Sequence, residues 1–135
     1  MRVVVDGNDG LGKSTLVAAL RQLGYEVSDR GLPTKMTDDP SLAENKDEFY
    51  LILDAPVEVS RQRLAQAGKD LNERYHTVED LTYYRQRFQD VARQLENCAV
   101  IDATGDAESV LAACLAVLRK RTAQARQPPA TAQEK

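Results

Sequence analysis

The chain has 135 residues and a mass of 15.0 kDa, which is enough for one domain with its own core and leaves no room for a second catalytic domain. A net charge of −3 and a pI near 5.2 exclude a global attraction for nucleic acid, so any contact with DNA must come from a local basic patch. Cys98 and Cys114 lack metal-ligand spacing and lie in apolar surroundings, which predicts free thiols in a reducing compartment. The first apolar run is too short for a leader or a membrane segment. We therefore expect a cytoplasmic protein.

The first element is a continuous β-branched run at residues 3–5, which is typical of a parallel strand buried on both faces. The residues that follow it fit the pattern G-x-x-x-x-G-K-[ST] of a phosphate-binding loop. Glycines allow backbone N–H groups to turn toward anionic oxygens, and the next helix points its positive end at them. Lys13 would then bridge the β- and γ-phosphates, and Ser14 would hold Mg²⁺. The predicted nucleotide-binding residues are Gly7, Asn8, Asp9, Gly10, Leu11, Gly12, Lys13, Ser14 and Thr15.

Apolar residues at helical spacing predict a helix over residues 13–23, which Gly24 would end in a left-handed conformation. Residues 25–28 are predicted as a short second strand. Asp29 and Arg30 follow at its carboxyl end, the edge at which open parallel sheets bind ligands. Residues 31–47 contain prolines and no periodicity, so they are predicted to form a loop.

The second half of the chain alternates strands and helices. We expect strands at residues 49–54 and 99–102, with helices after Pro56, Thr77 and Asp106. Residues 69–76 would form a polar connection, and the composition beyond Arg121 predicts a disordered tail. The chain is therefore predicted to be α/β, a three-layer domain around a small parallel sheet at residues 1–121, with a tail at residues 122–135.

At this point the motifs resemble a known family. The loop at residues 7–15 resembles the x-D-G-x-G-K-S-T loop of thymidylate kinases and their deoxynucleoside kinase relatives. Residues 51–63, Leu-Ile-Leu-Asp-Ala-Pro-Val-Glu-Val-Ser-Arg-Gln-Arg, resemble the family's L-D-x-P-x-E-x-x-x-x-R segment before the lid. The helix at residues 79–95, with its two adjacent tyrosines, continues the similarity over about two thirds of the chain. The resemblance implies a P-loop kinase fold, a phosphotransferase activity, and ATP and Mg²⁺ as cofactors.

One departure from that family bears on the acceptor of the phosphoryl group. Thymidylate kinases have another strand and helices between the first helix and the Asp-Arg strand, and these are missing here. The trimmed form resembles phage kinases that phosphorylate the hydroxymethyl group of 5-hydroxymethyldeoxyuridine in DNA, which would place the protein in the host cytoplasm. A kinase of free deoxynucleoside monophosphates such as dTMP is the main alternative, and a non-catalytic nucleotide-binding module is the third. A guanine-specific switch is disfavoured, because the sequence at residues 45–48 ends in Glu and precedes its strand.

Phosphoryl transfer requires cations on the migrating group and, for a hydroxyl acceptor, a base. Besides Lys13, we expect Arg63 or Arg74 to close over the phosphates, with Lys69 as another candidate. Asp29 is the predicted base and a magnesium ligand, in competition with Asp54 for the metal. Arg30 would steady that carboxylate or hold an acceptor phosphate.

The remaining polar and aromatic candidates have weaker signals. Asp9 could contact the acceptor or Mg²⁺, or make only a hydrogen bond inside the loop. His76 is predicted to lie at the surface beside the lid, because a single histidine without a paired acid is poor support for catalysis. Tyr83, Tyr84 and Phe88 are predicted to serve helix packing. A DNA contact would use Arg30, Lys35 and the lid cations.

Overall fold

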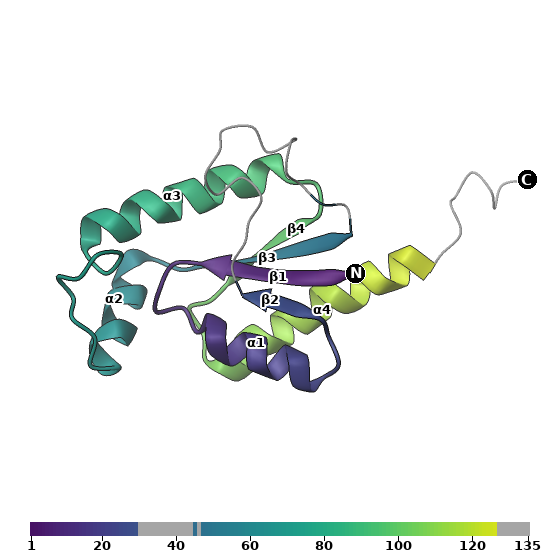
Figure 1. Ribbon diagram of the computed structural model, residues 1–135, viewed down its shortest axis with the longest axis horizontal. Coiled ribbons are helices and arrows are strands. Elements are labelled where there is room, and N and C mark those ends of the chain that lie inside the picture. The colour runs from purple at the N-terminus through teal and green to yellow at the C-terminus, as the bar shows by residue number, and fades with distance from the viewer. Residues whose placement is uncertain (30–44, 46, 127–135) are drawn as a thin grey trace, which may run out of the picture.

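A computed structural model describes residues 1–29, 45 and 47–126 of the chain (Figure 1). The described strands are β1 (Arg2–Gly7), β2 (Val27–Asp29), β3 (Glu48–Asp54) and β4 (Cys98–Asp102). They form one parallel sheet in the order β2-β1-β3-β4. The helices are α1 (Lys13–Gln22), α2 (Val57–Gln66), α3 (Val78–Gln94) and α4 (Ala107–Arg126). The alternation confirms the predicted α/β fold class.

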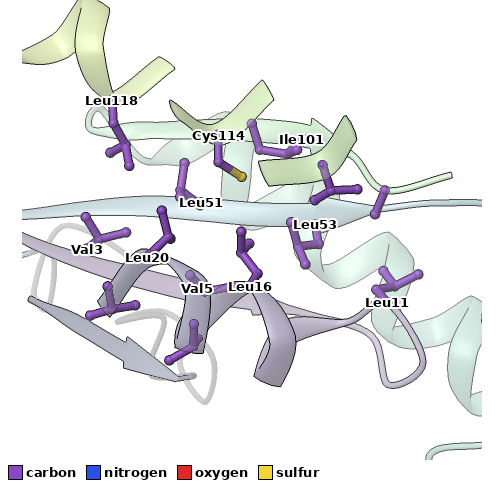
Figure 2. Close-up of a cluster of buried hydrophobic side chains, with 14 of the residues drawn as sticks. Val3, Val5, Leu11, Leu16, Leu20, Leu51, Leu53, Ile101, Cys114 and Leu118 are labelled. Atoms are coloured by element: carbon purple, nitrogen blue, oxygen red, sulfur yellow. The ribbon is translucent and has the colours of Figure 1, made fainter. Parts of the chain in front are cut away.

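Helices cover both faces of the sheet, which is why its strands carry continuous apolar runs. Figure 2 shows the larger cluster, in which Val5 and Leu51 of the sheet meet Leu16 of α1 and Cys114 of α4. On the opposite face Tyr50, which is fully buried, belongs to a second cluster with residues of α3. The three layers are therefore α1 and α4, the sheet, and α3.

The helix ends follow the predicted local signals. Gly24 and Gly68 adopt positive φ angles of 95° and 74°, at or just after the ends of α1 and α2. Thr77 accepts a hydrogen bond from the Asp80 backbone N–H at 3.1 Å, and Asp106 accepts one from Ser109 at 2.8 Å. Residues 67–77, hereafter the 67–77 connection, join α2 to α3 and lie beyond the carboxyl ends of the strands (Figure 1).

Several boundaries differ from the sequence prediction by one residue, and those of β2 and α4 differ by more. The second strand begins at Val27 and includes Asp29, because its extent is set by pairing with residues 3–5 of β1. Helix α4 continues past Arg121 to Arg126, so the predicted start of the tail at residue 122 is too early. No helix in the described part of the chain is long and apolar enough to cross a membrane.

Candidate active site

The phosphate-binding loop connects the carboxyl end of β1 to the amino end of α1. Gly10 and Gly12 have φ angles of 86° and 84°, which let the chain turn tightly ahead of the helix. Gly12 is the N-cap of α1 and provides no side-chain cap. The amino end of α1 therefore faces the loop without a capping side chain at residue 12, an arrangement that suits an anion.

Two close backbone approaches hold the loop in place. A Cβ atom on Gly10 would lie 2.7 Å from the carbonyl oxygen of Ser60 in α2. A Cβ atom on Gly7 would lie 2.6 Å from the carbonyl oxygen of Leu53 in β3. Asn8 adds a third tether, since its side-chain amide donates to the carbonyl of Leu81 in α3 at 2.9 Å. The loop is thus seated against three elements before any ligand binds.

Lys13 is folded back into this loop. Its ammonium group donates to the carbonyl oxygens of Gly7 at 2.6 Å and Asn8 at 3.0 Å, and its side chain is 8% exposed. Asp9 Oδ1 lies 3.7 Å from Nζ of Lys13. The ammonium group of Lys13 is therefore enclosed by the backbone of the phosphate-binding loop.

His76 is buried against the loop, so its predicted surface position is wrong. Its Nε2 lies 3.2 Å from Asp9 Oδ2, and its Nδ1 lies 3.0 Å from the carbonyl oxygen of Asp70. Arg61 of α2 holds the backbone there by donating to the carbonyls of Leu71 and His76 at 2.8 and 3.1 Å. The 67–77 connection folds over the loop because of these contacts. Asp9 therefore does more than make a hydrogen bond inside the loop. One of its oxygens faces Lys13 Nζ and the other faces His76 Nε2.

Arg63 lies at the end of α2 and is tied to the loop between β4 and α4. Its guanidinium donates to the carbonyls of residues 103, 104 and 105 at 2.7, 2.9 and 2.8 Å. It also lines a pocket of about 530 Å³ beside the phosphate-binding loop, a volume typical of small-ligand sites. Other lining residues are Gly12, Thr15, Ala19, Lys69, Asp106 and Leu111. A role for Arg63 in closing over the phosphates stays a prediction, and it would require these three bonds to open.

Arg74 lies on the outer side of the 67–77 connection. Its guanidinium carbon is 4.8 Å from the ring centroid of Tyr75, a residue held at φ 73°. The Tyr75 ring contacts Tyr84, which in turn contacts Tyr83, with centroid distances of 5.4 and 5.0 Å. Tyr83 is 57% exposed, so the packing role predicted for it is wrong.

The packing role predicted for Phe88 is confirmed. Phe88 packs against the apolar cluster beneath α3.

The predicted magnesium ligands are oxygen donors at two exposed positions. Ser14 lies in the first turn of α1, and Asp29 ends β2, in register with Val5. Hydroxyl and carboxylate oxygens suit Mg²⁺, which keeps several waters and shares its coordination with phosphates. Among the described residues, no three His, Cys, Asp or Glu side chains are grouped as a metal site. Ligation by Ser14 and Asp29 therefore stays a prediction, and Arg30 and Lys35 lie outside the described residues.

Asp54, the competing metal ligand, is engaged by an arginine. Its two oxygens accept from Arg85 Nε at 2.9 Å and Arg85 Nη2 at 3.2 Å. The hydrogen bond that Arg85 donates to Asp54 is the main cause that raises the pKa of the Arg85 guanidinium. This pair joins β3 to α3, so Asp54 has a structural partner that its sequence position did not indicate.

Sequence reasoning also missed Asp6 and Arg61. Asp6 is 2% exposed, and its Oδ1 accepts from the Gly7 backbone N–H at 2.8 Å. Its Oδ2 is buried with no hydrogen-bond partner among the described residues. A buried carboxylate at the end of a strand is visible in the sequence as an acid within an apolar run, whereas the contacts of Arg61 have no local signal.

Comparison with known proteins adds to this geometry. No protein-family model matches the chain. A thymidylate kinase from Xylella fastidiosa strain 9a5c is 34% identical over 88 residues, 65% of this chain and 41% of that protein. A thymidylate kinase from Nitrobacter hamburgensis is 33% identical over 87 residues, 60% of this chain and 37% of that protein.

Over about two thirds of its length, the chain is similar to thymidylate kinases. It matches only about two fifths of the length of these thymidylate kinases. A bifunctional cordycepin biosynthesis cluster protein 3 from Cordyceps militaris is 28% identical over 113 residues, 64% of this chain and 13% of that protein. The similarity to thymidylate kinases agrees with the resemblance that the motifs carry, and it supports the family assignment.

Proposed function

We propose that the chain is an ATP-dependent phosphotransferase of the thymidylate kinase family. The observation that carries the proposal is the phosphate-binding loop itself, in which Lys13 lies inside a turn that leads into the amino end of α1. Backbone N–H groups and one ammonium group are the donors that a triphosphate requires. The adjacent pocket of about 530 Å³ offers room for the nucleoside part of ATP.

Each step of the transfer then has a candidate residue. The positive charge of Lys13 stabilises the negative charge that builds up on the migrating phosphoryl group in the transition state. The oxygen of the acceptor hydroxyl bonds to the γ-phosphorus, and Asp29 accepts the proton that this hydroxyl loses. The bond between the γ-phosphorus and the oxygen of the β-phosphate breaks in the same step. Magnesium, held by Ser14 and Asp29, would neutralise phosphate charge. Arg30 would orient Asp29 or the acceptor, and Arg63 or Arg74 would close over the phosphates.

The favoured acceptor is the hydroxymethyl group of 5-hydroxymethyldeoxyuridine in phage DNA. Support comes from the short path between α1 and β2, where only residues 23–26 intervene. Strand β2 lies at the edge of the sheet, and Asp29 ends it with an exposed side chain. An edge of this kind suits an acceptor that is too large to be enclosed.

The similarity to thymidylate kinases favours a second candidate, a kinase of free deoxynucleoside monophosphates such as dTMP. A nucleotide-binding module without transfer is the third. It predicts that Asp29→Ala leaves the biological activity of the protein intact.

A parallel labelling experiment separates these candidates. The protein is incubated with magnesium and γ-labelled ATP, together with either hydroxymethyluracil-containing DNA or dTMP. We expect label in the DNA, and stronger labelling at low salt because a local basic grip on DNA weakens as salt rises. Label only in the mononucleotide would replace the favoured acceptor with the second candidate, and no label in either would favour the binding module.

Two lysine variants supply the control. Lys13→Ala should reduce transfer by at least about 100-fold, comparable to the loss of one transition-state donor in other enzymes. Lys120→Ala, at an exposed position on α4, should leave transfer unchanged. Retained transfer in Lys13→Ala would contradict the assignment of the loop.

A further inference from the structure

Three tyrosine rings and one guanidinium group form a continuous row where the 67–77 connection meets α3. The guanidinium carbon of Arg74 lies 4.8 Å from the ring centroid of Tyr75. The Tyr75 ring contacts Tyr84 at 5.4 Å between centroids, and Tyr84 contacts Tyr83 at 5.0 Å. Tyr75 and Tyr83, the two outer rings, are 41% and 57% exposed. The three rings, hereafter the tyrosine row, therefore present aromatic surface to solvent.

The apolar core does not account for the tyrosine row. Phe88 and Val91 pack α3 against the sheet, and none of the three tyrosines belongs to either apolar cluster of the described residues. The backbone of Tyr75 is strained as well, because its φ of 73° is left-handed, and its N–H donates to Asp80 Oδ2 at 2.8 Å. Strain of this kind is concentrated at sites that bind ligands. The rings are therefore available to a ligand.

The tyrosine row adjoins the phosphate-binding loop but not the pocket beside it. Tyr84 lies about one turn after Leu81, whose carbonyl oxygen accepts from the side chain of Asn8 at 2.9 Å. Tyr75 belongs to the 67–77 connection, which folds over the same loop. The pocket is lined by residues 10–12 of the loop and by none of the three tyrosines. When the nucleoside of ATP occupies that pocket, the row stays open to an acceptor.

The charges around the tyrosine row are mixed. On α3, Glu79 precedes Tyr83 by one turn and Arg87 follows it by one turn. On the connection, Glu73 precedes Arg74 and both are exposed. A contact dominated by phosphates needs several clustered cations, which this arrangement does not provide. Unpaired nucleobases fit better, because every base stacks on an aromatic ring and an arginine beside the ring adds a cation–π attraction.

We propose that the tyrosine row is a stacking surface for unpaired bases of a DNA strand, next to the acceptor nucleotide of that strand. Tyr83, the most exposed of the three rings, takes the outermost base. Arg74 contributes a cation at the other end of the row. The role of this surface in transfer rests on the proposed function, whereas binding of a strand can be measured without transfer.

Two strands of equal length test whether bases or phosphates are recognised. The full chain is titrated, without ATP, into a fluorescein-labelled oligothymidylate of about 12 nucleotides or an abasic strand of the same length, and anisotropy is measured. The abasic strand keeps the phosphates and lacks the bases. We expect the Kd for the oligothymidylate to be lower by about fivefold or more, the effect of stacking one base. Equal affinity for the two strands, or no binding of either, overturns the proposal.

Substitutions of the outermost ring test whether the row supplies this preference. Tyr83→Ala should raise the Kd for the oligothymidylate about fivefold or more and leave the Kd for the abasic strand unchanged. Tyr83→Phe keeps the ring and should stay within about twofold of the unsubstituted protein. Leu23→Ala is the matched control and should change neither Kd, because Leu23 is 56% exposed and follows the far end of α1.

Two results with these variants would overturn the stacking role. One is a Tyr83→Phe variant that binds as weakly as Tyr83→Ala. The other is a Tyr83→Ala variant that binds both strands normally, and a change in its sedimentation would then assign the ring to a contact between copies of the chain.

Kinetics separates this inference from the proposed function. With a single strand that contains hydroxymethyluracil as acceptor, Tyr83→Ala should raise the KM for DNA about fivefold and change neither kcat nor the KM for ATP. An unchanged KM for DNA overturns the role in acceptor binding while the proposed function stands. Base-dependent binding without transfer in the unsubstituted protein would count against the proposed function alone.

Discussion

At the scale of single residues, Arg63 connects the pocket to the loop that follows β4. The carbonyl oxygens of residues 103, 104 and 105 in that loop accept hydrogen bonds from its guanidinium. We expect Arg63→Ala to raise the KM for ATP about tenfold, because the pocket wall loses charge-assisted hydrogen bonds. Steady-state kinetics at varied ATP concentration measures this effect.

The arginine experiment also decides between two roles. A cation that acts on the migrating phosphoryl group would lower kcat by about 100-fold or more and leave KM nearly unchanged. Arg119→Ala, at an exposed position on α4, is the matched control and should change neither constant. A fall in kcat alone would support the catalytic role that the sequence predicts for Arg63.

Residue-scale predictions from sequence succeeded where the spacing is short. The loop pattern places Gly10, Gly12 and Lys13 within a few residues of one another, so local geometry suffices to predict a turn that leads into a helix. The pair of Asp9 and His76 spans 67 residues, and neither side chain has a local pattern that names the other. Such pairs depend on how the 67–77 connection folds over the loop, which periodicity does not describe.

At the scale of elements, the close contact between the phosphate-binding loop and α2 predicts how much stability is lost when a methyl group is added at Gly10. Gly10 combines a φ of 86° with a Cβ position only 2.7 Å from a backbone oxygen of Ser60. We expect Gly10→Ala to lower the free energy of unfolding by about 2 kcal/mol or more, because both the backbone conformation and the close approach are strained. Urea unfolding followed by circular dichroism measures the loss.

Gly24 offers a matched control for this substitution. Its φ is 95°, but apart from its chain neighbours no described residue has an atom within 4 Å of the position that a Cβ would take. Gly24→Ala should therefore cost only about 1 kcal/mol, the conformational part of the penalty. Equal losses for the two variants would mean that α2 moves away from the loop without cost.

A second element contact is the ion pair that joins β3 to α3. Arg85 and Asp54 form two hydrogen bonds, and their side chains are 33% and 22% exposed. Because this exposure allows solvent screening, we expect a coupling free energy of only about 1 kcal/mol. A double-mutant cycle with Asp54→Ala and Arg85→Ala, followed by urea unfolding, measures the coupling. A coupling near zero would show that the pair only orients α3.

Element boundaries were less predictable than element types. The apolar runs identified every described strand, but Val27 and Asp29 belong to β2 because of their pairing with β1. The end of α4 has a tertiary cause as well. Arg121 donates to Asn97 at 2.7 Å, and its guanidinium lies 5.7 Å from the ring centroid of Phe49. These contacts anchor the helix at the residue immediately before the predicted tail.

At the scale of the whole molecule, the core between the sheet and its first helical layer contains a thiol. Cys114 of α4 is fully buried among the residues drawn in Figure 2, and it is a free cysteine as the sequence predicted. Burial raises the pKa of the Cys114 thiol from its ordinary value near 9.0 to about 11. The unfolded chain therefore loses this proton at a lower pH than the folded chain does.

The sign of the resulting pH dependence follows from proton binding. Between about pH 9 and pH 11 the unfolded state binds fewer protons at Cys114 than the folded state, so stability falls as pH rises. The slope from this one group approaches about 1.4 kcal/mol per pH unit. Other groups titrate in the same range, so we expect the unsubstituted protein to lose stability more steeply than Cys114→Ala, in which the thiol is absent. Urea unfolding at several pH values from 8 to 11 measures both slopes, and parallel curves would mean that the thiol meets water or charge in the folded state.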